Sequence, residues 1–169
     1  MKKVFRLRWL QLFPVLPLIV LFLGASPKKK GLQWLDFDAG SSLAKKSKKP
    51  MLVDVYTDWC GWCKRMDKDT YSDQKIKKYL AQKYVLVKMN AESSDTVTYK
   101  GEKFTKEEIA EGFKVTGFPT VLFFEPNGDL ITSLPGYLPP EKFIYVAKFI
   151  GDGIYHTMKW EDYEKTIKD

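Results

Sequence analysis

The stretch Asp58–Lys64, with the sequence D-W-C-G-W-C-K, carries both cysteines of the chain, Cys60 and Cys63. Two thiols three positions apart could form a structural crosslink, half of a metal site, or a pair whose disulfide opens and closes in use. A crosslink that closes so small a loop removes little entropy from the unfolded chain and therefore stabilises the fold little. The purely structural interpretation is therefore weak.

The residues on either side of this motif predict a strand that runs directly into a helix. Met51–Thr57, MLVDVYT, is short, nearly all apolar and rich in β-branched residues, which indicates a buried strand. A helix is expected from Gly61 to about Thr70, so Cys60 falls at its N-terminus. The N–H groups and the dipole at that end favour an anion, so we expect the pKa of the Cys60 thiol to lie below the ~8.5 of a free thiol.

The position of each thiol predicts a different role in disulfide exchange. The thiolate is the attacking form, so we expect Cys60 to be the nucleophile. Cys63, one helical turn further along, is expected to be the resolving thiol. Trp62 between them is expected to shield the pair or to contact partners, although simple surface exposure is the alternative.

Asp54 is an ionisable residue in the middle of the predicted apolar strand. Burial raises the pKa of a carboxyl group, and Cys63 needs a proton acceptor near neutral pH when it becomes a nucleophile. The alternative is an edge-strand aspartate that faces water. Lys88, in a second predicted strand at Tyr84–Asn90, could pair with Asp54 or could be a solvated lysine near the strand end.

The remaining elements complete an alternating order of strands and helices. The predictions are a short strand at Trp34–Phe37, a helix over Ser41–Lys46 capped by Asp38, a helix over Asp73–Lys83 capped by Asp73, a polar loop at Ala91–Phe104, a helix opened by a capping box of Thr105 and Glu108, strands at Thr120–Glu125 and Leu130–Leu134, a helix from Pro140 to Ile150, and a last helix near Trp160–Lys168. The first strands should be parallel, because a helix connects them. The turn at Pro126–Asp129 indicates a hairpin, so the sheet should be mixed.

Composition and charge are those of a globular domain. The 169 residues are 44% hydrophobic and 29% charged, which suits one domain with a core. The net charge is +7, but four of the positive charges lie at Lys2, Lys3, Arg6 and Arg8, which leaves +3 for the rest. The other lysines interleave with acids, so a nucleic-acid-binding face is not expected.

The basic start is followed by the apolar run Trp9–Ser26, which is the layout of a secretory signal. Pro14 and Pro17 interrupt the run, and it is short for a membrane span. We expect residues 1–26 to be a signal peptide, with a retained membrane anchor as the alternative, and residues 27–31 to be a linker. Either segment places the body of the protein in a periplasmic or other extracytoplasmic compartment.

Four features together resemble the thioredoxin superfamily. They are W-C-G-x-C-K at Trp59–Lys64, Asp54 six residues before the first cysteine, Lys88 in the next strand, and Gly-x-Pro-Thr at Gly117–Thr120. The resemblance covers about residues 32–150 and is closest to exported bacterial thiol:disulfide interchange proteins. It implies an α/β thioredoxin fold, with a central mixed sheet of four to five strands flanked by helices. Residues 151–169 would then be a C-terminal helical extension.

The resemblance also implies a thiol–disulfide oxidoreductase whose redox-active group is the Cys60–Cys63 disulfide, with no other cofactor. The implied catalytic residues are Cys60, Cys63, Asp54 and Lys88, and the implied substrate-binding residues are Trp59, Gly61, Trp62, Phe118 and Pro119. A cis peptide bond before Pro119 is implied as well, and it would place the Phe118 backbone beside the cysteines. The expected partners are protein thiols and disulfides and a membrane electron donor, with the protein itself a monomer.

The direction of electron flow and the class of function leave alternatives. The dipeptide Gly61-Trp62 lacks the histidine associated with strong oxidants, which favours a reductant over a disulfide oxidase or isomerase. A zinc site needs four ligands, and a lone His156 does not complete one, so no metal site is expected. Copper(I) can be held by two thiolates, so a copper-handling module is the rival class, with Met66 and Met89 as candidate soft ligands. A binding domain with an unused cysteine pair is a third alternative.

Overall fold

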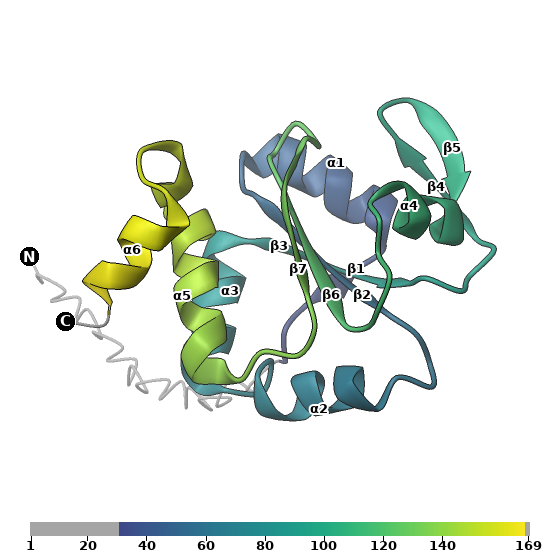
Figure 1. Cartoon of the computed structure of the whole chain (residues 1–169). Helices are drawn as coiled ribbons and strands as arrows, with labels where there is room; N and C mark the ends of the chain where they lie inside the picture. Colours follow the sequence, from purple (N-terminus) through teal and green to yellow (C-terminus); the bar gives the residue numbers. More distant parts are fainter. Residues whose placement is uncertain (1–30, 168–169) are drawn as a thin grey trace, which may run out of the picture.

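The computed structural model describes residues 31–167 (Figure 1), so the expected signal or anchor and most of the linker lie outside the described residues. Within those residues, no helix combines the length and apolar composition needed to cross a membrane.

The elements in chain order are β1 (Trp34–Leu35), α1 (Phe37–Ser47), β2 (Met51–Tyr56), α2 (Gly61–Asp69), α3 (Gln74–Lys83), β3 (Val85–Asn90), β4 (Thr96–Tyr99), β5 (Glu102–Thr105), α4 (Lys106–Gly112), β6 (Thr120–Phe124), β7 (Leu130–Pro135), α5 (Pro140–Gly151), the 3₁₀ helix η1 (Ile154–His156) and α6 (Trp160–Thr166).

Five of the strands form a mixed sheet in the order β1-β3-β2-β6-β7, which confirms the predicted fold class. Strand β2 is central: it pairs in parallel with β3 and in antiparallel with β6. Both faces of β2 are covered, which explains why its sequence is a nearly continuous apolar run rather than an alternating one. Asp54 of β2 lies opposite Lys88 of β3 in this register.

Helices cover both faces of the sheet (Figure 1). Residues of α1 and α4 share one core cluster with Val53 and Val55 of β2. Residues of α2, α3 and α5 share the other cluster with Leu52. Because side chains alternate along a strand, Asp54 points to the same face as Leu52, which is the face that α2 covers. The topology therefore brings this carboxyl group toward the helix that carries Cys63.

Two helix starts agree with the predicted caps, and one does not. The Asp73 carboxylate accepts hydrogen bonds from the first N–H groups of α3, and the capping box of Thr105 and Glu108 opens α4. The prediction for Asp38 was wrong, because α1 already begins at Phe37. The Asp38 carboxylate instead accepts a hydrogen bond of 2.7 Å from the backbone N–H of Thr98, 60 residues along the chain.

The expected loop at Ala91–Phe104 contains a hairpin instead, formed by β4 and β5. Lys100 and Gly101 turn the chain with φ angles of 51° and 91°, a left-handed conformation that glycine adopts readily. Val97 lies opposite Phe104 in the register and is buried, so one face of the hairpin joins the core beneath it. The polar residues of this segment had concealed that alternation.

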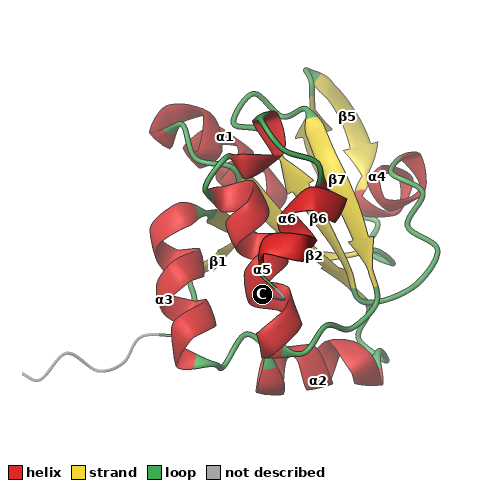
Figure 2. Cartoon of the chain, turned by 60° about the vertical axis from the view of Figure 1, so that its left-hand side comes forward, coloured by secondary structure: helices red, strands yellow, loops and turns green. Residues whose placement is uncertain are grey.

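The C-terminal residues form a short helical extension beside α5. Helix α6 lies in front of α5 in Figure 2. Its Trp160 and Tyr163 rings pack on Phe149 of α5, with centroid distances of 5.3 and 5.2 Å. In Figure 1 this extension lies beside α5, away from α2.

Candidate active site

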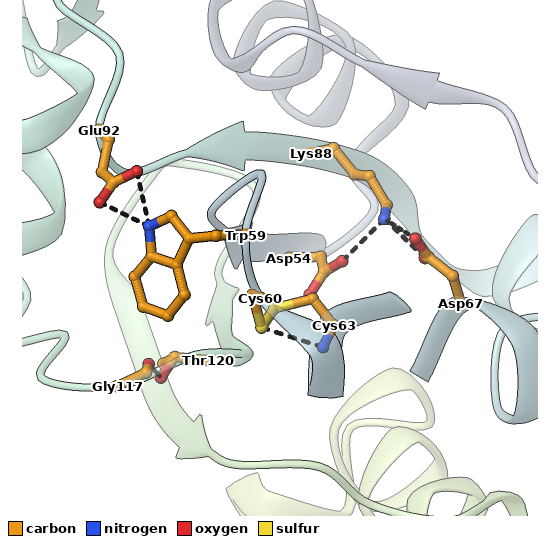
Figure 3. The surroundings of a disulfide bond; sticks show 9 residues. All are labelled: Asp54, Trp59, Cys60, Cys63, Asp67, Lys88, Glu92, Gly117 and Thr120. Carbon is orange, nitrogen blue, oxygen red and sulfur yellow. Dashed lines mark hydrogen bonds and ion pairs between the residues drawn. A yellow bond between two sulfur atoms is a disulfide. The ribbon is translucent and has the colours of Figure 1, made fainter. Parts of the chain in front are cut away.

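The two cysteines are joined by a disulfide at the point where the chain leaves β2 and enters α2. Cys60 is the N-cap residue of α2, and its Sγ accepts a hydrogen bond of 3.0 Å from the backbone N–H of Cys63 (Figure 3). Only 3% of Cys60 and 4% of Cys63 is exposed. After reduction, the same N–H group and the helix N-terminus would stabilise a thiolate on Cys60.

Asp54 is buried, with 1% of its surface exposed, so the edge-strand alternative is wrong. Its Oδ2 lies 3.3 Å from Nζ of Lys88, while its Oδ1 has no hydrogen-bond partner within the described residues. Burial raises the pKa of Asp54 from 3.8 to about 6, and the Lys88 ammonium group limits that rise. The carboxyl group can therefore gain or lose a proton close to neutral pH.

Lys88 connects the sheet to the helix of the cysteines. Its Nζ donates to both carboxylate oxygens of Asp67 at 2.6 and 2.7 Å, in addition to its ion pair with Asp54 (Figure 3). Burial on its own would lower the pKa of Lys88, but the carboxylates of Asp54 and Asp67 outweigh burial and raise it above 10.5. Lys88 is thus an ion-paired lysine rather than a solvated one.

Asp67 is a site residue that the sequence reasoning missed. It lies four residues after Cys63, so both side chains project from the same face of α2. Lys88 pairs with both Asp67 of α2 and Asp54 of β2, so it links the buried acid to the helix turn that follows Cys63. The helical spacing from Cys63 was the signal that could have identified it.

Trp59, immediately before Cys60, borders the disulfide on one side. It is 66% exposed, yet its indole N–H donates to the Glu92 carboxylate at 2.8 and 3.0 Å (Figure 3). Its ring meets Phe118 edge-on with 5.9 Å between centroids. Glu92 follows β3 in a polar loop, and no local pattern distinguished it from the other acids of that loop.

The segment before β6 has the expected geometry. The peptide bond between Phe118 and Pro119 is cis. The Pro119 carbonyl accepts a hydrogen bond of 2.8 Å from the N–H of Gly136, and the Thr120 hydroxyl donates to the Gly117 carbonyl at 2.7 Å. These bonds fix the backbone on either side of Phe118, whose ring contacts that of Trp59.

Trp62 and Gly61 occupy the first turn of α2 on the exposed side. Trp62 is 55% exposed and is not a core residue. Its ring contacts that of Tyr137 with 5.4 Å between centroids, so it has a defined partner. A Cβ added to Gly61 would meet no atom within 4 Å, so the packing does not require glycine there.

The described residues contain no group of three or more His, Cys, Asp and Glu side chains arranged to hold a metal ion. Met66 and Met89 are 1% and 0% exposed and belong to the core, so packing accounts for both of the candidate soft ligands. His156 lies in η1, where its ring stacks on Tyr155 and its side chain is 60% exposed.

Comparisons with known proteins find a domain family and several relatives that this chain resembles. A family model described as a thioredoxin-like domain matches residues 37–151. The thiol:disulfide interchange protein DsbD of Yersinia pestis is 34% identical over 104 residues, and that of Actinobacillus pleuropneumoniae is 36% identical over 98 residues. These matches cover 60% and 57% of this chain but only 16% and 15% of the two relatives.

A solved structure is similar to this chain in fold. A thioredoxin-fold protein from Helicobacter pylori superposes with a TM-score of 0.65 and 30% sequence identity. The match covers 72% of this chain and 81% of that protein.

Proposed function

The chain belongs to the thioredoxin-like family, and on that premise we propose that it is a thiol–disulfide oxidoreductase that reduces protein disulfides. One observation carries the proposal: Cys60 caps α2, is bonded to Cys63, and accepts the Cys63 N–H at its sulfur. That arrangement favours a thiolate on Cys60 over one on Cys63. The name of the DsbD relatives, thiol:disulfide interchange protein, supports the same chemistry.

The first step forms a mixed disulfide. In the reduced protein the Cys60 thiolate attacks one sulfur of the substrate disulfide. A bond forms between Cys60 Sγ and that sulfur, and the other substrate sulfur leaves as a thiolate. We expect a bound polypeptide to contact Trp59, Trp62 and the backbone at Phe118 and Pro119. The two exposed tryptophans are adjacent in sequence to the almost buried cysteines, and the Phe118 ring contacts that of Trp59.

The second step releases the substrate. Cys63 gives its proton to the Asp54 carboxylate and attacks Cys60 Sγ, which expels the second substrate thiolate. The protein is left with the Cys60–Cys63 disulfide, and the substrate has gained two electrons. Asp54 suits this role because its pKa of about 6 leaves it mostly ionised at neutral pH but able to hold a proton. Lys88 keeps its carboxylate oriented.

The setting of the reaction is part of the proposal. The basic and apolar leader at residues 1–26 supports a location outside the cytoplasm. In an oxidising compartment, the disulfide of a reductant must be reduced again after each reaction, so a membrane-bound thiol donor is the expected electron source. The protein would act as a monomer, since the family domain already carries the whole cysteine site.

Equilibration in glutathione buffers, read by tryptophan fluorescence, tests the direction of transfer. Potentials in this fold run from about −270 mV for reductants to about −120 mV for strong oxidants. A reductant should fall in the lower half of that range, and the wild type should cleave insulin disulfides far faster than Cys60→Ser. A potential near the upper limit would contradict the assigned direction, whereas full activity in Cys60→Ser would contradict the assigned chemistry.

A further inference from the structure

Trp62 is exposed, yet its ring contacts two other side chains, Tyr137 and Arg65. Its ring contacts Tyr137, which lies between β7 and α5, 75 positions along the chain. The guanidinium carbon of Arg65 lies 5.2 Å from the centre of the Trp62 ring and 5.3 Å from that of Tyr137. These contacts tie the first turn of α2 to the loop that precedes α5.

Asp69 completes this arrangement, which we call the Trp62 cluster (Trp62, Arg65, Asp69 and Tyr137). One of its carboxylate oxygens lies 3.2 Å from Nε of Arg65 and accepts a hydrogen bond of 3.2 Å from the Tyr137 hydroxyl. The positive charge next to the rings is thereby compensated. The cluster offers a neutral aromatic surface, and little side-chain entropy remains to be lost when a partner covers it.

The reaction determines what can cover this surface. Cys60 is only 3% exposed, so a substrate sulfur can reach it only if the substrate's neighbouring residues rest on the residues around the cysteine. Trp62 precedes Cys63 directly and is the second most exposed large apolar side chain among the described residues, after Trp59. Exposed aromatic residues with fixed geometry are the usual centres of binding energy in interfaces.

We propose that the Trp62 cluster selects the substrate: it binds an apolar side chain that neighbours the attacked cysteine of a polypeptide disulfide. Trp62 makes the contact, and Tyr137, Arg65 and Asp69 are positioning residues that hold its ring. This inference rests on the proposed disulfide reduction and names its substrate class. Polypeptides with aromatic or aliphatic residues beside the cysteine are favoured over those with small polar ones. An apolar side chain buries apolar surface against the neutral aromatic cluster, whereas a small polar side chain has little apolar surface to bury there.

A pair of peptides tests the inference with the full chain. Each peptide holds one intramolecular disulfide, and they differ only in the residues that flank one cysteine, which are phenylalanine in one and serine in the other. Single-turnover rates of the pre-reduced protein against peptide concentration give an apparent affinity and a limiting rate for each. The wild type should prefer the phenylalanine peptide by about tenfold, mostly through affinity, since one well-formed aromatic contact contributes on the order of 1.4 kcal/mol.

Variants separate this role from a merely structural one. Trp62→Ala and Tyr137→Ala should each reduce the preference to about twofold or less, whereas Tyr137→Phe, which keeps the ring, should retain most of it. Tyr145→Ala is the matched control, because Tyr145 is an exposed tyrosine of α5 outside the cluster. Thermal unfolding of each variant establishes that it is folded, and Trp62→Ala removes a half-exposed ring outside the core.

The outcomes distinguish the two proposals. A preference that survives in both Trp62→Ala and Tyr137→Ala would overturn the role of the cluster while leaving disulfide reduction intact. A wild type that reduces neither peptide faster than Cys60→Ser does would overturn the proposed function itself, and this inference with it.

Discussion

Two carboxylates near the disulfide, Asp54 and Glu92, are chemically alike but differ in burial, and therefore in what each can do. Asp54 is 1% exposed and its pKa is raised to about 6, so its carboxyl group can gain or lose a proton near neutral pH, as the proposed exchange with Cys63 requires. Glu92 is exposed and accepts the indole N–H of Trp59, so it orients a side chain that a partner would touch. The chemistry of the site therefore comes from where each acid lies, and removing one acid at a time should separate proton transfer from binding.

The largest expected effect is that of Asp54→Asn on the second step of the reaction. The amide cannot accept the Cys63 proton, so release of the substrate from a preformed mixed disulfide should slow by roughly 100-fold at pH 7.5. Rapid quenching followed by mass spectrometry measures the decay of that species. The matched Glu92→Gln variant should resolve it within about twofold of the wild-type rate, and equal losses in the two variants would refute the separation.

Asp54 should also make the stability of the oxidised protein depend on pH. Its pKa is about 6 in the folded protein and 3.8 as the ordinary value, so the folded form binds the proton more tightly. The stability it contributes is complete below about pH 4 and is lost as the pH rises through 6. The free energy of unfolding should therefore fall by about 2 kcal/mol between pH 4 and pH 7 on account of this group.

Urea unfolding at a series of pH values measures that fall. Asp54→Asn should remove it, so the variant should gain on the wild type as the pH rises, whereas Glu92→Gln should follow the wild-type curve. Parallel curves for Asp54→Asn and the wild type across this range would mean that the buried carboxyl group does not titrate there.

Lys88→Met should have a smaller effect, which is a shift in the pH dependence of mixed-disulfide resolution rather than a loss of the reaction. The Lys88 ammonium group lowers the pKa of Asp54 and pairs with Asp67, so its removal leaves two acids without a shared cation. The midpoint of the pH profile for mixed-disulfide resolution should move upward by about one pH unit. An unchanged midpoint would show that the ion pair has no influence on the proton acceptor.

Much of the site was predictable because it depends on residues close together in sequence. The strand of Met51–Tyr56 is followed closely by the helix after Cys60, so the position of the cysteines follows from local patterns. The burial of Asp54 was one of two alternatives, and the central place of β2 in the sheet decides it. Asp67 obeys the same helical logic relative to Cys63 and could have been found. The cis bond before Pro119 was available only through the family resemblance.

The remaining contacts could not be predicted because they join distant parts of the chain. Tyr137 reaches Trp62 only after β7 and α5 have packed, and Glu92 reaches Trp59 only once β2 and β3 lie side by side. Asp38 is a further example: its side chain could have capped a helix, but it accepts a hydrogen bond from the backbone N–H of Thr98 in the distant β4–β5 hairpin instead. Local sequence patterns indicate which residues can cap a helix, and the packing of the whole chain determines which hydrogen bonds form.

Glu92→Ala should have the smallest effect of the series. Removing the acceptor frees the indole of Trp59, so the apparent affinity for a peptide disulfide should fall about twofold to threefold. Stability should change by less than about 0.5 kcal/mol, because the side chain is exposed. Single-turnover kinetics at several peptide concentrations separate this weaker binding from the limiting rate, which should stay near that of the wild type.

The order in which the two sulfurs act is the claim on which the proposed reaction and its kinetic effects depend, and trapping tests it most directly. Reduced Cys63→Ser and Cys60→Ser variants are each mixed with a disulfide peptide, and the adducts are quantified by mass spectrometry. We expect Cys63→Ser to accumulate a stable mixed disulfide on Cys60, and Cys60→Ser to form almost none in the same time. Comparable adduct formation on Cys63 in the Cys60→Ser protein would contradict the assignment of Cys60 as the nucleophile.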